Sequence, residues 1–179
     1  LEPIATVTNN FNEFKLGEAS VDRVFELLRL KPAIAELPDA IELPEVTGRV
    51  EFEAVSFAYT PERPVLQDLN LRVLPGEMVA LVGTSGAGKT TLVNLIPRFY
   101  DPQVGEVWID RVNVRDVSLK SLRRQIGIVP QETTLFSGTI AQNIAFGQLE
   151  FDLNAVKRAA KIANAHQFIS QFPNGYDTW

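Results

Sequence analysis

Residues 83–91 read Gly-Thr-Ser-Gly-Ala-Gly-Lys-Thr-Thr, and this stretch decides the expected fold class of the 179-residue chain. Its first eight residues fit G-x-x-x-x-G-K-[ST], a pattern in which glycines let consecutive backbone N–H groups turn inward toward an anion. A helix that starts at such a loop adds unpaired N–H groups and its positive dipole end. We therefore expect the whole stretch to bind the phosphates of a nucleotide: Gly83, Thr84, Ser85, Gly86, Ala87, Gly88, Lys89, Thr90 and Thr91.

Three side chains of this stretch have expected roles of their own. Lys89 can reach the β- and γ-phosphates as a point charge, which makes it a candidate catalytic residue. The hydroxyl of Thr90 can ligate Mg²⁺, which is otherwise held mostly by phosphate and water oxygens, and Thr91 is placed to bond the α-phosphate. The alternative interpretation is a glycine-rich turn with an exposed lysine. The flanking sequence favours a site for a nucleoside triphosphate.

The segments around the loop predict an α/β arrangement. Residues 78–82 form a short apolar run that is typical of a strand buried on both faces, and a helix follows the loop and stops near Pro97. Upstream, the apolar spacing predicts strands at 50–57 and 66–73. Downstream we expect a hairpin at 105–114, a strand at 126–129, and helices around 139–146, 152–165 and 166–172.

The first 30 residues carry a helical stripe of heptad type, formed by Ile4, Val7, Phe11, Phe14, Val21, Phe25 and Leu28. Pro32 ends this helix, and Pro38 and Pro44 punctuate an extended linker that follows it. The residues alone leave open whether the stripe packs against another helix or folds back on its own domain.

Composition excludes several classes of protein. The net charge is −5, and all of the excess negative charge lies in residues 1–48, so no basic surface for nucleic acid is expected. With no Cys and one His, the chain has no disulfide, thiolate zinc site, cysteine nucleophile or polyhistidine metal centre. No apolar run approaches the length of a membrane span, so we expect the chain itself to be soluble.

Residues on both sides of the loop carry a family resemblance. They are Phe57-Ala58-Tyr59 upstream, and Val-Pro-Gln-Glu at 129–132, Leu-Phe-Ser-Gly-Thr-Ile at 135–140 and Asn143-Ile144 downstream. Together with the loop they resemble the nucleotide-binding domain of an ABC transporter, and the 135–140 run is similar to the exporter type. The resemblance implies a P-loop NTPase fold, with a RecA-like parallel sheet core, an antiparallel β-subdomain and the start of a helical subdomain.

The resemblance also implies a division of the chain. Residues 1–47 resemble the helix and linker at the end of an exporter's transmembrane domain, and 48–179 resemble part of the nucleotide-binding domain. Within that part, 48–131 is the expected core with the phosphate loop and 132–179 the helical subdomain. The implied partners are the transmembrane domains of the same transporter and a second nucleotide-binding domain in a dimer. The implied location is the cytoplasmic face of a membrane, the inner membrane in a bacterium.

By the same resemblance, Tyr59 stacks on the adenine of ATP, since a flat π-face suits a purine. Gln131 provides an amide oxygen for Mg²⁺ or the attacking water, which adds it to the catalytic, nucleotide and metal sets. Without the resemblance, Tyr59 reads as a half-buried strand residue and Gln131 as a surface loop residue. Leu135 and Phe136 are candidates for docking to the transporter's coupling helices, or for local packing.

Three motifs of the family do not occur in the chain, namely the Leu-Ser-Gly-Gly-Gln signature, an apolar strand that ends in Asp-Glu, and the histidine loop that follows that strand. His166, the one histidine, is in the wrong place for that loop, and we expect no function for it. The resemblance therefore implies that this chain binds Mg-ATP with little or no hydrolysis, since the general base and part of the positioning machinery are missing. We expect a fragment of a larger motor domain, whose phosphate-loop strand leaves an apolar edge open to pairing.

Three functions compete at this point. The first is the ATP-binding portion of an ABC exporter, which couples ATP binding and hydrolysis to export across a membrane. The second is a stand-alone nucleotide-binding or interaction module without hydrolysis, and the third is a small-molecule kinase. Tyr59 and the 135–140 run weigh against the kinase. The transported substrate, and the choice between homodimer and heterodimer, are not encoded in these residues.

Overall fold

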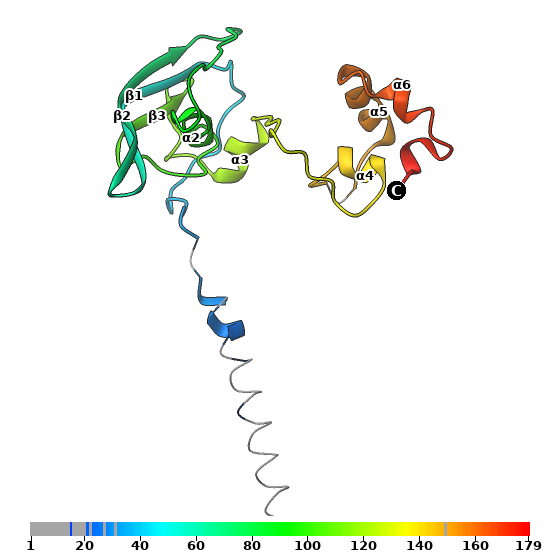
Figure 1. Cartoon of the computed structure of the whole chain (residues 1–179), viewed down its shortest axis with the longest axis horizontal. Coiled ribbons are helices and arrows are strands. Elements are labelled where there is room, and N and C mark those ends of the chain that lie inside the picture. The colour runs from blue at the N-terminus through cyan, green and yellow to red at the C-terminus, as the bar shows by residue number, and fades with distance from the viewer. Residues whose placement is uncertain (1–14, 16–20, 22, 27, 31, 149) are drawn as a thin grey trace, which may run out of the picture. The chain divides into compact units, whose positions relative to one another are not determined.

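The computed structural model describes residues 15, 21, 23–26, 28–30, 32–148 and 150–179 (Figure 1). The chain divides into two compact units, Leu1–Gly127 and Ile128–Trp179. The helix expected over residues 1–30 falls mostly outside the described residues, although the described positions 21, 23–26, 28 and 29 are helical. Within the described ranges, every helix is too short or too polar to span a bilayer.

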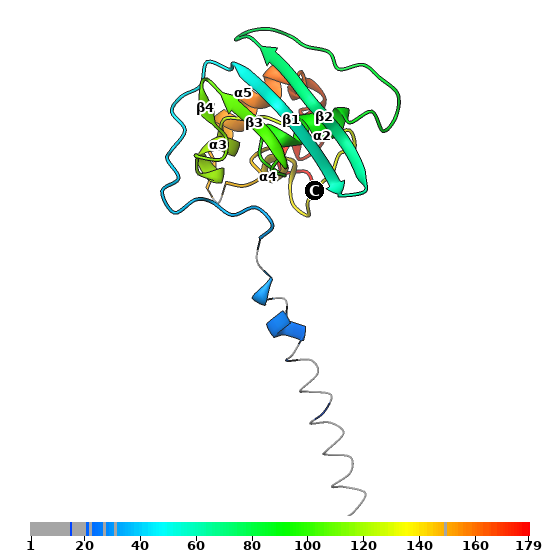
Figure 2. The ribbon, with the colours of Figure 1, turned by 90° about the vertical axis from the view of Figure 1, so that its left-hand side faces the viewer.

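The first unit is built on a four-stranded antiparallel sheet with the strand order β2-β1-β3-β4 (Figure 2). Strand β1 (Val50–Thr60) turns into β2 (Arg63–Val73), and β3 (Val104–Ile109) turns into β4 (Val112–Asn113). The two upstream strands and the downstream hairpin expected from the sequence are thereby confirmed. Strand β2 begins earlier than predicted because it pairs with β1 up to the turn.

One face of this sheet carries the hydrophobic core of the first unit. Phe52 pairs with Leu71 of β2 and Val107 of β3, and paired residues share a face of the sheet. Two helices add to the core, α2 (Lys89–Leu95) after the loop and α3 (Leu119–Arg124) after β4. The buried residues of this core are Leu43, Phe52, Val55, Phe57, Leu66, Leu92, Leu95, Val107, Ile109, Val114, Val117 and Leu122.

The predictions of strands at 78–82 and 126–129 are wrong. In the described part of the chain neither segment pairs with a strand, and Met78, Val82 and Val129 are 98%, 90% and 95% exposed. A strand that is buried on both faces exists through hydrogen bonds to its neighbours, and an apolar composition alone cannot supply those neighbours. The sheet of the first unit is therefore the antiparallel one, and the expected parallel core is not formed among these residues.

The predicted linker is attached to the first unit, and its Leu43 belongs to the hydrophobic core. Ile41 forms a parallel bridge with Val117, and two backbone hydrogen bonds of 2.9 Å flank that bridge. The Gln125 side chain donates to the carbonyl oxygen of Leu43 at 3.1 Å and accepts from the N–H of Val46 at 2.9 Å. These contacts join segments about 80 positions apart in the sequence. The proline pattern therefore predicts an extended chain, but it does not predict that this chain binds to the first unit.

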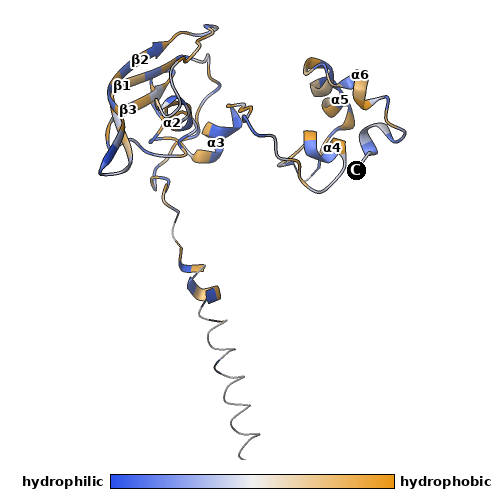
Figure 3. Ribbon diagram, viewed as in Figure 1, coloured by the Kyte–Doolittle hydropathy of each residue, from blue (hydrophilic) through white to orange (hydrophobic). Residues whose placement is uncertain are grey.

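The second unit is helical. It consists of α4 (Ile140–Ile144), α5 (Leu153–Ile162), α6 (His166–Ile169) and the short 3₁₀ helix η1 (Gly175–Asp177), so the predicted helices are confirmed with shorter bounds. In Figure 3, α4 carries both hydrophobic and hydrophilic residues, as expected for a helix that is buried on one side. The buried core of this unit is formed by Ala141, Ala145, Val156, Ala160, Ile169 and Tyr176.

Side-chain caps explain where α4 and α5 begin. Thr139 precedes α4 and forms a reciprocal capping box with Gln142. Asp152 precedes α5 and accepts hydrogen bonds from the N–H groups of Asn154 and Ala155 at 2.9 and 3.1 Å. Each cap satisfies N–H groups that have no partner inside the helix, and so places the first turn.

Candidate nucleotide-binding site

The glycine-rich loop runs directly into α2. Gly86 and Gly88 have φ angles of +81° and +84°, in the left-handed region that favours glycine. Gly88 is the N-cap of α2, and its carbonyl oxygen accepts the first helical hydrogen bond from Leu92 at 2.8 Å. The N–H of Ala87 donates to the carbonyl oxygen of Thr84 at 3.2 Å, which closes the loop into a tight turn.

The side chain of Lys89 folds back onto the glycine-rich loop. Its ammonium group donates hydrogen bonds to the carbonyl oxygens of Gly83 and Thr84, both at 2.8 Å. Two carbonyl oxygens of the loop thereby hold the ammonium group in place. An ammonium has three donors, so one remains for an incoming anion while the loop contacts persist.

At Gly88 the loop also lies close to β2. A Cβ atom at this position would lie 3.0 Å from Leu66 Cδ2, 3.1 Å from Val65 Cγ1 and 3.2 Å from the Val65 carbonyl oxygen. The absence of a side chain therefore lets the start of α2 rest against β2. The sequence pattern predicts a glycine at this position, but only the fold shows that β2 packs against it.

The two threonines after Lys89 have different surroundings. Thr90 is exposed, so its hydroxyl is accessible to an ion or a water molecule. Thr91 is buried at 5% exposure, and its hydroxyl lies 3.0 Å from the hydroxyl of Tyr59. This hydrogen bond joins the end of β1 to the first turn of α2. The structure thus brings together Tyr59 and Thr91, two of the residues predicted to contact the nucleotide.

Tyr59 belongs to a cluster of aromatic rings. Its ring meets those of Phe57 and Tyr100 in T-shaped contacts, with centroid distances of 4.9 and 5.2 Å and interplanar angles of 88°. Such edge-to-face pairs are among the favoured aromatic geometries. Tyr59 lies on β1 and is 52% exposed, as expected for a half-buried strand tyrosine, and part of its surface stays accessible.

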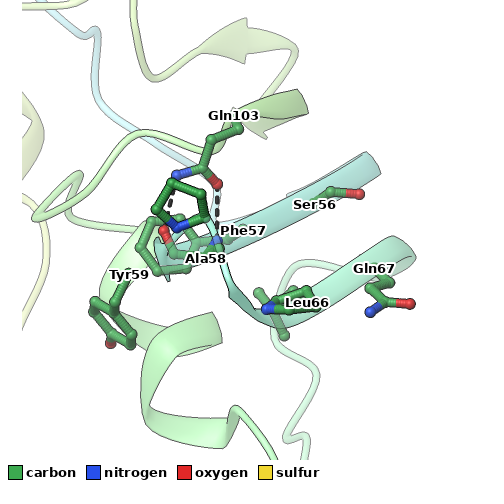
Figure 4. Close-up of a pocket in the computed structure, with 9 residues that line it drawn as sticks. Ser56, Phe57, Ala58, Tyr59, Leu66, Gln67 and Gln103 are labelled. Carbon is green, nitrogen blue, oxygen red and sulfur yellow. Dashed lines mark hydrogen bonds between the residues drawn. The ribbon is translucent and has the colours of Figure 1, made fainter.

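Gln103 holds the backbone next to Tyr59. Its side-chain amide accepts from the N–H of Ala58 and donates to the carbonyl oxygen of Ala58, both at 2.8 Å (Figure 4). The amide therefore takes the place of a neighbouring strand where β1 extends past β3. A pocket of about 370 Å³ adjoins this clamp, lined among others by Leu66 and Gln67. The ring of Tyr59 points away from these two residues in Figure 4.

The remaining predicted site residues lie in the second unit. Gln131 is exposed, in a segment without regular structure. Leu135 is 83% exposed, whereas the ring of Phe136 stacks on Phe146 at a centroid distance of 3.8 Å. Local packing therefore accounts for Phe136 but not for Leu135. Both residues line an apolar groove of about 710 Å³, together with Ser137, Gly138, Ile140, Asn143, Ile144, Ala165, Phe168, Ile169, Phe172, Thr178 and Trp179.

Asn143 organises one wall of this groove, a role that the sequence pattern did not predict. Its side-chain oxygen accepts from the N–H of Phe136 at 2.8 Å, and its amide nitrogen donates to the carbonyl oxygen of the same residue at 2.9 Å. His166, for which the sequence pattern indicates no function, has its Nδ1 atom 2.8 Å from the hydroxyl of Tyr176. Its position on α6 therefore ties that helix to η1.

Among the described residues, Glu51 and Asp110 have shifted pKa values, and both lie outside the glycine-rich loop. A hydrogen bond from Arg49 holds the pKa of Glu51 below its ordinary value, and Arg72 adds a second hydrogen bond. Burial tends to raise the pKa of Asp110, but hydrogen bonds from Arg49 and Thr47 outweigh this and lower it. Among the described residues, no three His, Asp or Glu side chains come together as a metal-binding cluster.

Comparison with known proteins places this site in a family. The family model described as ABC transporter matches residues 66–177, which include the whole glycine-rich loop. The ATP-dependent lipid A-core flippase of Syntrophus aciditrophicus (strain SB) is 50% identical over 177 residues, which cover 99% of this chain and 29% of the flippase. ABC transporter B family member 29, chloroplastic, of Arabidopsis thaliana is 46% identical over 181 residues, covering 99% and 28% of the two chains.

A solved structure gives the same result. The structure of a bacterial Atm1-family ABC exporter with ATP bound matches with a TM-score of 0.83 and 39% sequence identity, covering 94% of this chain and 30% of that one. The chain thus spans less than a third of the length of these relatives. The matched model, the sequence identities and the shared fold lead to one conclusion: this chain belongs to the ABC transporter family, with the P-loop NTPase fold of its nucleotide-binding domain.

Proposed function

We propose that this chain binds ATP through residues 83–91 and Tyr59. The observation that carries the proposal is the ammonium group of Lys89, which the carbonyl oxygens of Gly83 and Thr84 hold at 2.8 Å. A cation already in place meets a phosphate with charge-assisted hydrogen bonds and loses little side-chain entropy on binding. The solved exporter named above has ATP bound, which supports the choice of nucleotide.

Mg²⁺ fits the donors that the loop offers. The ion prefers oxygen ligands, usually one or two from the protein, with phosphate and water oxygens completing the octahedron. The exposed hydroxyl of Thr90 is one such donor. We propose the amide oxygen of Gln131 as the other, on the strength of the family resemblance. The bound ion would neutralise charge on the β- and γ-phosphates.

The ring of Tyr59 is the proposed adenine platform. Its two ring neighbours, Phe57 and Tyr100, meet it in T-shaped geometry, and its side chain keeps 52% of its surface exposed. Stacking on an aromatic ring is worth about 1–3 kcal/mol per base and needs an open ring face. Gln103 supports this role because it fixes the backbone of the residue before Tyr59.

For the whole protein, we propose an ABC exporter that couples ATP binding and hydrolysis to the export of a substrate across a membrane. Residues 1–47 would then be the helix and linker that follow a transmembrane domain. Residues 48–179 would be part of the nucleotide-binding domain, with its core at 48–131 and its helical subdomain at 132–179. The names of the relatives support this proposal, since they describe a flippase and an exporter.

The proposed partners are the transmembrane domains and a second nucleotide-binding domain, at the cytoplasmic face of the membrane. The apolar groove of the second unit supports the first of these. Leu135, Phe168 and Trp179 line it and are 83%, 55% and 85% exposed, so an apolar segment could bury them. We propose that a coupling helix of the transmembrane domain occupies this groove.

The binding of ATP is tested by Lys89→Ala. Removing a charged donor from an anion site costs about 1.5–3 kcal/mol, so we expect ATP affinity to fall roughly 10- to 100-fold. Titration calorimetry with Mg-ATP measures this. The matched control is Lys120→Ala, which removes an exposed lysine from α3 and should leave affinity unchanged. Equal binding by Lys89→Ala and the unchanged chain would contradict the assignment of the loop.

A further inference from the structure

We propose that Tyr59 is a positioning residue for the α-phosphate as well as a platform for the base, an inference that rests on the proposed function. The observation is the pair of hydroxyl groups of Tyr59 and Thr91, whose oxygens are 3.0 Å apart. In this pair the Tyr59 hydroxyl donates to Thr91, and Thr91 in turn donates to an oxygen of the α-phosphate.

The direction of this relay follows from counting hydrogens. A hydroxyl group has one hydrogen to donate and two lone pairs that accept. A phosphate oxygen only accepts, so Thr91 must give its single hydrogen to the phosphate once the nucleotide is bound. The 3.0 Å contact then persists only if Tyr59 is its donor. Binding of the anion therefore orients both hydroxyls, and each hydrogen bond polarises the next.

The surroundings of Thr91 make this orientation matter. Thr91 is 5% exposed, and in the described part of the chain the Tyr59 hydroxyl is the sole hydrogen-bond partner of its side chain. Water therefore has little access to replace the tyrosine as a donor. The Tyr59 side is also held, because Gln103 binds both backbone groups of the preceding residue at 2.8 Å.

The relay separates two contributions of one side chain. A ring that only stacks on adenine affects ligands that contain a base and leaves base-free ligands alone. A hydroxyl that orients Thr91 affects any ligand that places a phosphate at that threonine, with or without a base. Inorganic tripolyphosphate with Mg²⁺ is therefore a probe that stacking alone would not influence.

The test is Tyr59→Phe, which keeps the ring and removes the hydroxyl. We expect the affinity of the chain for Mg-tripolyphosphate to fall about three- to tenfold, the usual effect of one net hydrogen bond. The matched control is Tyr100→Phe, whose ring adjoins Tyr59 and whose hydroxyl makes no hydrogen bond within the described residues. It should bind tripolyphosphate as the unchanged chain does.

A double-mutant cycle with Thr91→Val identifies the path of the effect. Once the threonine hydroxyl is removed, Tyr59→Phe should cause no further loss of tripolyphosphate affinity. Equal tripolyphosphate binding by the unchanged chain and Tyr59→Phe would overturn the relay, and so would an additive loss in the double mutant. If the unchanged chain binds neither Mg-ATP nor tripolyphosphate, the proposed function is overturned, and the relay with it.

Discussion

At the scale of single residues, Gly88 satisfies two independent requirements. Its φ angle of +84° lies in the region where a side chain is strained, and an added Cβ atom would crowd Val65 and Leu66 of β2. The nearby Gly76 satisfies only the first. It has a φ angle of +74°, and a Cβ atom added there would meet nothing within 4 Å in the described part of the chain beyond its sequence neighbours. Comparing a substitution at Gly88 with one at Gly76 therefore separates the cost of backbone strain from the cost of close packing.

We predict that Gly88→Ala destabilises the chain more than Gly76→Ala does. The left-handed backbone costs an alanine about 1 kcal/mol at either position. At Gly88 the added methyl group also presses on β2, which we expect to raise the loss of unfolding free energy to roughly 2–3 kcal/mol. Urea unfolding of both variants measures the difference. Equal losses would show that β2 yields to the methyl group without cost.

At the scale of elements, Asp110 joins the start of β1 to the turn between β3 and β4. Its carboxylate accepts from the backbone N–H groups of Thr47, Gly48 and Arg49 and from the hydroxyl of Thr47. These donors lower the pKa of Asp110 despite the opposing effect of burial. A carboxylate with a lowered pKa stabilises the fold above its ordinary titration range and loses this effect as the pH falls through its folded-state pKa.

We predict that Asp110→Asn lowers the unfolding free energy at pH 7, because the amide NH₂ would face the N–H groups that the carboxylate now accepts from. Since the site is open to solvent, we expect the loss to be only roughly 0.5–1 kcal/mol. The difference from the unchanged chain should shrink as the pH falls through the lowered folded-state pKa of Asp110. Urea unfolding at several pH values measures this. Asp116→Asn is the control, because that carboxylate is exposed and makes no hydrogen bond within the described residues. A difference that stays constant with pH would contradict the prediction.

The same scale shows which elements a sequence pattern predicts well. The hairpin at β3 and β4 and the helices α2, α4 and α5 are all encoded locally, by turns, caps and spacing. The runs at 78–82 and 126–129 have the composition of buried strands but no pairing partner in the described chain. A strand needs a neighbour, and that neighbour is not part of the local pattern.

At the scale of the whole molecule, the proposed site rests on groups that bind the nucleotide. The chain contains Lys89 and the loop threonines, but no Leu-Ser-Gly-Gly-Gln signature and no apolar strand that ends in Asp-Glu. Phosphoryl transfer depends on the positioning of the attacking water and on charge stabilisation around the transferred group. Binding and turnover should therefore separate in this chain.

We predict that the chain binds Mg-ATP but releases phosphate no faster than the background hydrolysis in buffer. A phosphate-release assay under conditions of saturating ATP measures this, with binding checked in parallel by calorimetry. The control for contaminating ATPases is the Lys89→Ala variant prepared in the same way. Turnover above background that Lys89→Ala abolishes would contradict the prediction.

Some residues of the candidate site can be predicted from the local sequence pattern, whereas others come together only through the fold. The nine residues from Gly83 to Thr91 are identified by spacing alone, because the chemistry of a phosphate loop is contained in one continuous stretch. The contact between Tyr59 and Thr91 joins positions 32 apart, and that between Gln103 and Ala58 joins positions 45 apart. No spacing rule predicts such pairs, since the turns and packing between them set the distance.

By itself, the sequence determined the glycine-rich loop, the helix that follows it, the antiparallel hairpins and the helices of the second unit. Each of these depends on neighbours within a few positions, and the physical rules that govern them act locally. Only the tertiary structure decided that the runs at 78–82 and 126–129 remain unpaired in the described chain, that the linker lies along the first unit, and that Tyr59 meets Thr91. These features require partners from distant parts of the chain, and folding alone brings such partners together.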